Sequence, residues 1–128
     1  TQLARSLQPD TVPHEDAIFN LSRASLLIAA LLDSPELLLE ATEDRLHQNY
    51  RASAMPETDE LIGHLRASGY AAVVSGAGPS ILVLCSDPAQ RPAVEALIAA
   101  KQKSPWECHT LTVDERGATV ETLPALAD

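Results

Sequence analysis

The sequence predicts a single α+β domain with an antiparallel sheet. Helix-type periodicity and helix-capping residues fill the first half of the chain, up to about residue 66. Strand-like apolar runs are gathered after residue 70, with one further helical segment among them. Helices and strands segregated in this way are typical of α+β proteins, whereas a parallel sheet requires regular alternation. A chain of 128 residues is long enough to form one domain with its own core.

One long helix dominates the N-terminal quarter. Residues 1–6 read as the end of an element, and Pro9 marks the loop that follows. The helix is predicted from Pro13 or His14 to Leu32, with acidic residues in its first turn, where they complement the helix dipole. From Leu26 onward almost every position is apolar, so this half is expected to be buried on most sides. One face is formed by small or apolar residues: Ile18, Leu21, Ser25, Ile28, Ala29 and Leu32.

Two further helical segments follow. Ser34 as N-cap and Pro35 at the first helical position signal a new start. The pattern leaves open whether residues 35–41 and 43–51 form one helix or two. Another helix is predicted from Pro56 or Thr58 to about residue 66, ended by Ser68-Gly69. Its inward-facing residues are expected to be Leu61, Ile62 and Leu65.

The second half contains the predicted sheet. Apolar runs on either side of residues 75–80 predict two strands joined by a glycine loop. A helix is predicted from Asp87-Pro88 to about Lys101. Alternation at residues 106–113, a turn at 114–117 and a second run at 118–123 predict a closing hairpin. Residues 124–128 are expected to be a frayed tail.

Charge and composition restrict the partners. Eighteen acidic residues oppose nine basic ones, for a net charge of −9, which disfavours nucleic acids and anionic membranes. Seven of the nine bases are arginines, whose guanidinium groups suit carboxylates and phosphates, so a small anionic substrate remains possible. No signal peptide is visible, and the longest apolar stretch, residues 24–32, is too short to span a bilayer. Cys85 and Cys108 read as small core residues of a reduced, cytoplasmic protein without a structural metal.

The loop at residues 75–80 has two readings. Its glycines, backbone N–H groups and serine hydroxyls could line an anion-binding concavity. A plain hairpin turn explains the same residues. In the segment before it, Arg51 would share a face with Glu40, Asp44 and His47 if residues 40–51 were helical. Arg5 is a second candidate for binding a carboxylate, and both arginines can equally be read as ordinary surface residues.

Four stretches together resemble the C-terminal domain of the homoserine kinases, a branch of the GHMP kinase superfamily. They are residues 1–5 (TQLAR), 16–24 (DAIFNLSRA), 43–51 (EDRLHQNYR) and 75–80 (SGAGPS). The resemblance implies a ferredoxin-like antiparallel sheet with helices packed on one face. It also implies ATP-dependent phosphorylation of the hydroxyl of L-homoserine, in the cytoplasm, as a step of threonine biosynthesis. Residues 1–128 would then be the substrate-side domain of a longer chain.

The resemblance also implies roles for individual residues. Thr1 matches a catalytic threonine near the reacting hydroxyl, and Arg5 and Arg51 match arginines that bind the homoserine carboxylate. Asn20 matches an asparagine on the substrate side. The loop beside the phosphates corresponds to Ser75, Gly76, Ala77, Gly78, Pro79 and Ser80.

Two departures from the family pattern shape the expectations. The Gly-rich nucleotide loop of the superfamily's N-terminal domain is absent, so ATP and Mg²⁺ are expected to bind mainly outside this chain. This chain alone is therefore predicted to be inactive. The sequence also begins where the first strand of the domain should have ended, so one sheet edge is expected to lack its partner.

Two other classes of function remain open from the residues alone. The chain could be a stand-alone ferredoxin-like module that binds a small molecule or regulates another protein. It could also be a module for helix-mediated association, because of its apolar residues 26–32. A homodimer of this kind is compatible with the kinase reading.

Overall fold

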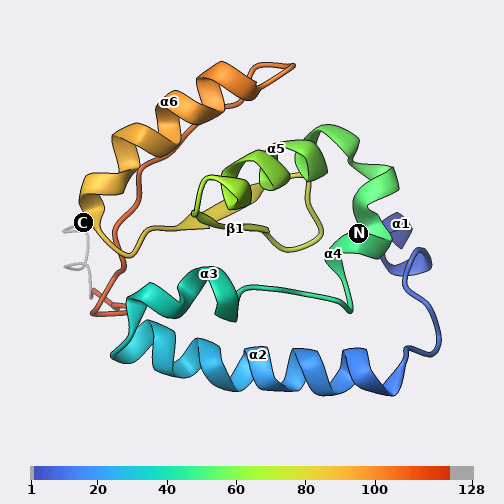
Figure 1. The fold of residues 1–128 in the computed structure, drawn as a ribbon. Helices are drawn as coiled ribbons and strands as arrows, with labels where there is room; N and C mark the ends of the chain where they lie inside the picture. Colours follow the sequence, from blue (N-terminus) through green and yellow to red (C-terminus); the bar gives the residue numbers. More distant parts are fainter. Residues whose placement is uncertain (1, 122–128) are drawn as a thin grey trace, which may run out of the picture.

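The computed structural model describes residues 2–121. Thr1, the predicted catalytic residue, and the predicted tail at 124–128 lie outside the described residues. Figure 1 shows a long helix along one side, a short hairpin in the middle and a further helix on the opposite side. The helices are α1 (Gln2–Ser6), α2 (His14–Leu32), α3 (Leu38–Ala41), α4 (Gln48–Arg51), α5 (Pro56–Ala67) and α6 (Arg91–Lys101). Short 3₁₀ turns are η1 (Pro35–Leu37), η2 (Ala52–Ala54) and η3 (Pro88–Gln90), and the strands are β1 (Ala71–Val74) and β2 (Ile81–Leu84).

The hairpin of β1 and β2 lies between two layers of helices. The strands pair antiparallel, with Ala71 opposite Leu84 and Val74 opposite Ile81. Successive strand residues point to opposite faces, so Ala71 packs with α2 and α3, while Ala72 packs with α5 and α6. The α+β class and the hairpin are therefore confirmed. The expectation that helices pack on one face is wrong, because helices cover both faces of β1.

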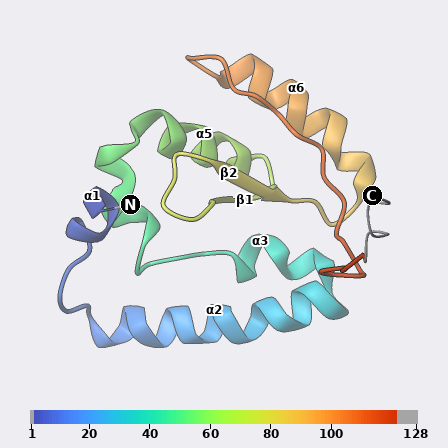
Figure 2. The ribbon, with the colours of Figure 1, turned by 180° about the vertical axis from the view of Figure 1, so that it is seen from behind.

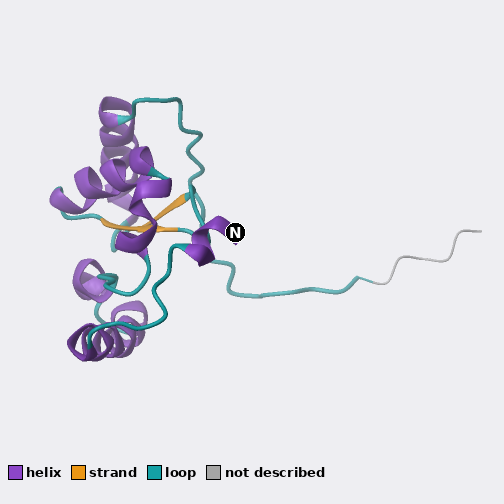
Figure 3. Cartoon of the chain, turned by 90° about the vertical axis from the view of Figure 1, so that its right-hand side faces the viewer, coloured by secondary structure: helices purple, strands orange, loops and turns teal. Residues whose placement is uncertain are grey.

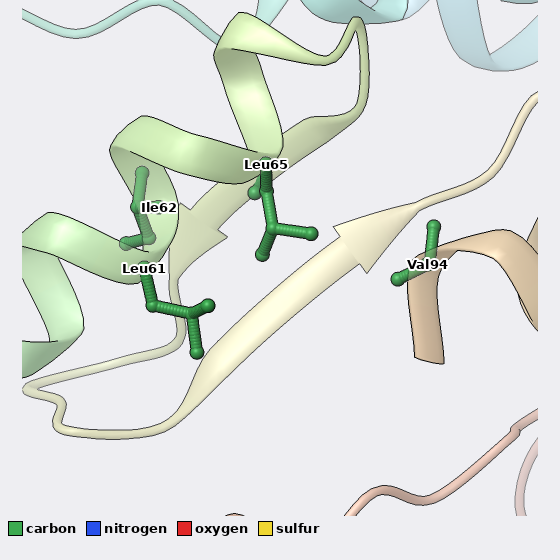
Figure 4. Packing of buried hydrophobic residues seen from close by; sticks show 5 residues of the cluster. Leu61, Ile62, Leu65 and Val94 are labelled. Carbon is green, nitrogen blue, oxygen red and sulfur yellow. The ribbon is translucent and has the colours of Figure 1, made fainter. Parts of the chain in front are cut away.

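The main core lies between α5, the hairpin and α6. Leu61, Ile62 and Leu65 of α5 and Val94 of α6 pack in one cluster on the face of the hairpin that carries Ala72 (Figure 4). Leu65 has an exposed fraction of 0%. Burying a side chain of this size stabilises the fold by roughly 1.5–3 kcal/mol. The predicted inward residues of α5 are confirmed.

The ends of α5 follow the predicted signals. Pro56 lies in the first turn, where its missing N–H costs nothing, and Glu57 and Asp59 add acidic charge there. Beyond the last turn, Gly69 takes a φ of 88°, a conformation that other residues adopt at a cost. The chain then turns directly into β1.

Residues 35–51 form two separate helices. η1 and α3 end at Ala41, and α4 begins at Gln48, with non-helical chain between them. Glu40, Asp44 and Arg51 therefore do not share the helical face that continuous helix would have given them. Asp44 instead accepts hydrogen bonds from the backbone N–H groups of residues 46–48, which lead into α4, as described below.

The bounds of α2 are confirmed, but the prediction that its second half is buried on most sides is wrong. Only Ala30 of this helix is buried. Leu26 and Leu27 pack toward α3 and β1, while Ile28, Leu31 and Leu32 are exposed. Figures 1 and 2 show why: α3 and the hairpin cover one side of α2, and no described segment covers the other.

The closing hairpin is the clearest departure from the predicted fold. Residues 106–121 contain no strand, and residues 122–123 of the second run lie outside the described part. Figure 3 shows the last described residues leaving the body of the molecule as extended chain. A β-type pattern forms a strand only when it pairs with another, and a two-stranded ribbon gives weak support for further pairing. Trp106 still packs against the main core, Cys85 is half-buried, and Cys108 is exposed rather than a core residue.

Candidate functional site

The glycine loop closes the hairpin tightly. The backbone N–H of Ser75 donates to the carbonyl of Ser80 at 2.8 Å, and that of Gly78 donates to the carbonyl of Ser75 at 3.1 Å. Gly76 and Gly78 have φ values of 61° and 77°, in the region where residues with a Cβ are strained. The loop is therefore a preorganised turn whose two glycines are needed for its path.

The two glycines face different surroundings. A Cβ at Gly78 would lie 2.6 Å from the Met55 sulfur, so this glycine packs against the start of α5. A Cβ at Gly76 would meet nothing within 4 Å. The backbone at Gly76 is thus open for a ligand to approach, while Gly78 serves the packing of the loop.

Two side chains hold the ends of this loop. The hydroxyl of Thr58, on α5, donates to the carbonyl of Pro79 at 3.1 Å. The side-chain carbonyl of Gln48, on α4, accepts from the backbone N–H of Val74 at 2.6 Å. The loop is consequently fixed to both neighbouring helices rather than being a free hairpin turn.

Arg51 lies beside the loop at the end of α4. Its Nη1 donates to the carbonyl of Gly76 at 2.9 Å, and its Nε donates to the carbonyl of His47 at 3.2 Å. Within residues 2–121 these bonds leave the Nη2 amino group available. A guanidinium anchored through Nε and Nη1 in this way still presents the two N–H groups of Nη2, and its positive charge, to a ligand at the loop.

Asp44 holds the start of α4 in place. Its carboxylate accepts hydrogen bonds from three backbone N–H groups, those of Leu46 at 3.1 Å, His47 at 2.8 Å and Gln48 at 2.6 Å. Partial burial by itself would raise the pKa of Asp44, but these backbone bonds and one from Asn20 lower that pKa below its ordinary value. The carboxylate is therefore ionised at neutral pH, and it compensates the unpaired donors of the helix start.

Asn20 connects α2 to the same segment. Its amide nitrogen donates to Asp44 at 2.7 Å, and its oxygen accepts from the backbone N–H of Arg45 at 2.8 Å. Arg45 also stacks on the ring of Phe19, with its guanidinium carbon 3.8 Å from the ring centre. The predicted substrate-side residue Asn20 thus positions the chain that leads into α4, and through it Arg51.

A further arginine is half-buried against residues 39–42. Arg66 of α5 donates to the carbonyl of Leu39 at 2.6 Å, to the Thr42 hydroxyl at 3.0 Å and to the carbonyl of Ala72 at 3.2 Å. Burial lowers the pKa of Arg66, and the nearby Glu43 opposes that shift. Arg66 lines a cavity of about 380 Å³ between α2, α4 and α5. Three carbonyl or hydroxyl acceptors identify it as a residue that ties α3, α5 and β1 together.

Arg5, the other arginine predicted to bind a carboxylate, is exposed and lies in the final turn of α1. The backbone N–H of Gln8 donates to the carbonyl of Arg5, and the side-chain oxygen of Gln8 lies 3.0 Å from His47 Nδ1. α1 is therefore connected to the start of α4 (Figure 1). The segment that carries Arg5 and the helix that carries Arg51 meet on the side of the molecule that also carries the glycine loop.

The structure thus brings Arg51 into contact with the glycine loop. It also connects the segment that carries Arg5 to the start of α4, through Gln8 and His47. Asn20 does not belong to this group, but it binds the turn that precedes α4. Sequence reasoning missed Gln48, Thr58 and Arg66. Asp44 lies four residues before α4, outside the N-cap position that a capping pattern marks, and bonds across the fold leave no local pattern. In residues 2–121, no group of three His, Cys, Asp or Glu side chains could hold a metal ion. No helix in the same part is long and apolar enough to cross a membrane.

Comparison with known proteins assigns most of the chain to one family. The family described as GHMP kinases C terminal matches residues 19–103. A homoserine kinase of Clavibacter michiganensis subsp. michiganensis is 66% identical over 123 residues, which are 96% of this chain and 39% of that protein. A homoserine kinase of Leifsonia xyli subsp. xyli is 68% identical over 120 residues, covering 94% of this chain and 37% of the relative.

Similarity extends to a more distant relative and to a solved structure. A homoserine kinase of Streptomyces coelicolor is 50% identical over 129 residues, covering 100% of this chain and 40% of that protein. A crystal structure of homoserine kinase from Cytophaga hutchinsonii has a TM-score of 0.69 at 22% identity, covering 77% of this chain and 32% of that one. The similarity to this crystal structure supports the fold described above. The chain spans about two fifths of the length of the curated relatives that it matches.

Proposed function

This chain belongs to the family of GHMP kinases C-terminal domains, and we propose that it forms the substrate-binding part of a homoserine kinase. The whole enzyme would transfer the γ-phosphoryl group of ATP to the side-chain hydroxyl of L-homoserine. Homology to several homoserine kinases at 50–68% identity supports this substrate. A cytoplasmic location and a place in threonine biosynthesis follow from the same proposal.

The position of Arg51 is the observation that carries the proposal. Its guanidinium is anchored to the carbonyl of Gly76 at 2.9 Å, and its Nη2 group is available within residues 2–121. A carboxylate bound there would lie next to the open backbone of the glycine loop. An amino acid held by its carboxylate in this position has a fixed orientation, and positioning is the main protein contribution to phosphoryl transfer.

The other site residues have complementary roles in the proposal. Arg5 supplies a second positive charge for the carboxylate, and Thr1 acts near the reacting hydroxyl. Residues 75–80 line the phosphate side, where backbone N–H groups favour negative charge. Asn20 supports the site by holding Asp44 and Arg45.

ATP and Mg²⁺ are assigned mainly to the remainder of the longer polypeptide. When bound, Mg²⁺ would neutralise phosphate charge during transfer. Residues 1–128 alone are accordingly expected not to turn over the substrate.

The test measures ADP release by the natural polypeptide that contains this sequence, with and without L-homoserine. Arg51→Ala is expected to raise the KM for homoserine about 30- to 150-fold, the effect of losing a charge-assisted contact. The KM for ATP should stay unchanged. Arg116→Ala, which removes an equally charged but exposed arginine far along the chain, is the matched control and should leave both constants as they are.

Three other results would contradict parts of this proposal. An equal rise in both KM values would mean that Arg51 only supports the glycine loop. An unchanged KM for homoserine would remove Arg51 from the site. Absence of homoserine-dependent ADP release would refute the kinase and favour the stand-alone binding module.

A further inference from the structure

A single hydrogen bond joins the segment around α1 to the rest of the described molecule. None of the residues of α1 is buried, and so short a helix is not stable by itself. Within the described part of the chain, the only hydrogen bond between residues 2–12 and later residues connects Gln8 to His47, whose Nδ1 lies 3.0 Å from Gln8 Oε1. Figures 1 and 2 both show α1 beside α4. The position of this segment therefore depends on His47.

Three hydrogen bonds connect the two arginines that are predicted to bind a carboxylate. The backbone N–H of Gln8 donates to the carbonyl of Arg5 at 3.2 Å. The side chain of Gln8 bonds to the ring of His47, and the carbonyl of His47 accepts from Nε of Arg51 at 3.2 Å. His47 thus contacts the segment of one arginine through its ring and the other arginine through its backbone. The bond from its ring is the one that a substitution of His47 removes.

The positive charge of these two arginines is not neutralised by an acidic residue. Arg23 and Arg45 pair with acidic side chains, but within residues 2–121 neither Arg5 nor Arg51 forms a salt bridge. The chain has a net charge of −9, so acidic partners are abundant. Two arginines that are connected to each other and keep their charge suit an anionic ligand between them.

We propose that His47 is a positioning residue, which holds Gln8 so that Arg5 acts on the same carboxylate as Arg51. This inference rests on the proposed function, in which that carboxylate belongs to homoserine. A charged group that is already in place binds its ligand more strongly, because less of the interaction energy is used to order the segment that carries it. His47 does not touch the substrate in this role, and it contributes by fixing α1 beside α4.

The bond between Gln8 and His47 does not require one particular charge on the ring. With a proton on Nδ1, the ring donates to the oxygen of Gln8 both as imidazole and as imidazolium. With the proton on Nε2 instead, the amide of Gln8 can turn and donate to Nδ1. The contact is therefore an anchor that works in each protonation state of His47, and not a pH switch.

The first test measures the kinetics of the natural, longer polypeptide with ATP and L-homoserine. His47→Ala should raise the KM for homoserine about 3- to 10-fold, the effect of losing one hydrogen bond, while kcat and the KM for ATP stay unchanged. Gln8→Ala should have the same effect, because it removes the other partner of the bond. His109→Ala, at an exposed histidine elsewhere, is the matched control and should leave all three constants as they are.

A double-mutant cycle separates positioning of Arg5 from general support of α4. In an Arg5→Ala background, His47→Ala should raise the KM for homoserine no further, because the residue that it positions is already gone. An effect of the same size in both backgrounds would show that His47 acts on Arg51 or on the fold as a whole. That result would overturn the inference, as would a His47→Ala variant with the natural KM.

A conservative variant tests whether the hydrogen bond itself matters. The amide nitrogen of His47→Asn takes roughly the place of Nδ1, so the bond to Gln8 can form again. This variant should have a KM for homoserine close to the natural value. His47→Leu fills similar space without a donor and should behave like His47→Ala. The same raised KM in the Asn and Leu variants would contradict a role for the bond.

Hydrogen exchange supplies a readout that does not depend on turnover. The backbone N–H of Gln8 should exchange faster in His47→Ala than in the natural polypeptide, and at the natural rate in His109→Ala. A natural polypeptide that shows this change but no homoserine-dependent ADP release would refute the proposed function, and with it the role of Arg5 at the carboxylate. Homoserine-dependent turnover with no change of KM in His47→Ala would refute the positioning role alone.

Discussion

α5 and α2 show how differently two apolar helices are used in one small fold. α5 buries Thr58, Leu61, Ile62 and Leu65 although α2 is the more apolar of the two. α2 buries only Ala30. The difference lies in the surroundings, because the hairpin and α6 close over α5 while α2 has neighbours on one side only. Apolar content therefore indicates that a helix needs partners, and the tertiary arrangement decides which of its faces obtains them.

The same contrast extends to the segments attached to each helix. The start of α5 contacts the glycine loop through Met55 and Thr58, so the α5 side of the molecule carries the candidate site. The link between the two sides is polar, and runs from Asn20 of α2 to Asp44 and on to α4. Three sets of substitutions test how strongly each part is stabilised.

The largest loss of stability is expected in the core around α5. Leu65→Ala should lower the free energy of unfolding by about 3 kcal/mol at every protein concentration, because it opens a cavity in a fully buried position. Leu32→Ala, at a position 74% exposed on α2, should cost under about 1 kcal/mol in dilute protein. Equal costs in dilute protein, measured by urea unfolding, would contradict the contrast between the helices.

A smaller effect is expected in the glycine loop. Gly78→Ala should cost about 1–2 kcal/mol, since it combines a positive φ with a Cβ that obliges the flexible end of the Met55 side chain to move. Gly76→Ala has the positive φ but open space, so about 1 kcal/mol is expected for it. The two variants are compared by urea unfolding, and a reversed order would mean that the loop packs against something other than Met55.

The smallest effect is at the polar link, and it depends on pH. Because the pKa of Asp44 is lowered in the folded protein from an ordinary 3.8, its carboxylate stabilises the fold above that pH. This contribution is lost as the pH falls through the folded value. Asp44→Asn should therefore cost about 1 kcal/mol near pH 6 and progressively less toward pH 3. A difference from the natural protein that does not shrink in acid would show that shape, and not charge, matters at this position.

Local signals predicted most element boundaries correctly. Pro56 and Gly69 mark the ends of α5, and the apolar runs around residues 75–80 become β1 and β2. Such signals succeed because helix ends and tight turns depend on a few neighbouring residues. The glycine loop and Arg51 were predicted as site residues from residue type and from resemblance to a family, and their role stays a prediction.

Two wrong predictions, the strand at residues 106–113 and the burial of residues 26–32, share one physical cause. Residues 106–113 alternate like a strand, yet a strand exists only with a partner, and the described residues provide none for them. Residues 26–32 are apolar almost throughout, yet burial depends on what lies opposite. Both properties are relations between distant segments, and neither can be read from one of the segments alone.

What the sequence by itself determined, then, is the α+β class, the starts and ends of α2 and α5, the hairpin and its glycine loop, because each rests on contacts within a few residues. Only the tertiary structure decided that helices cover both faces of β1, that Gln48 holds α4 against the hairpin, and that Arg51 meets Gly76. The bonds from Gln48 and Arg51 join residues 26 and 25 positions apart, and their energies exist only once the chain has brought the partners together.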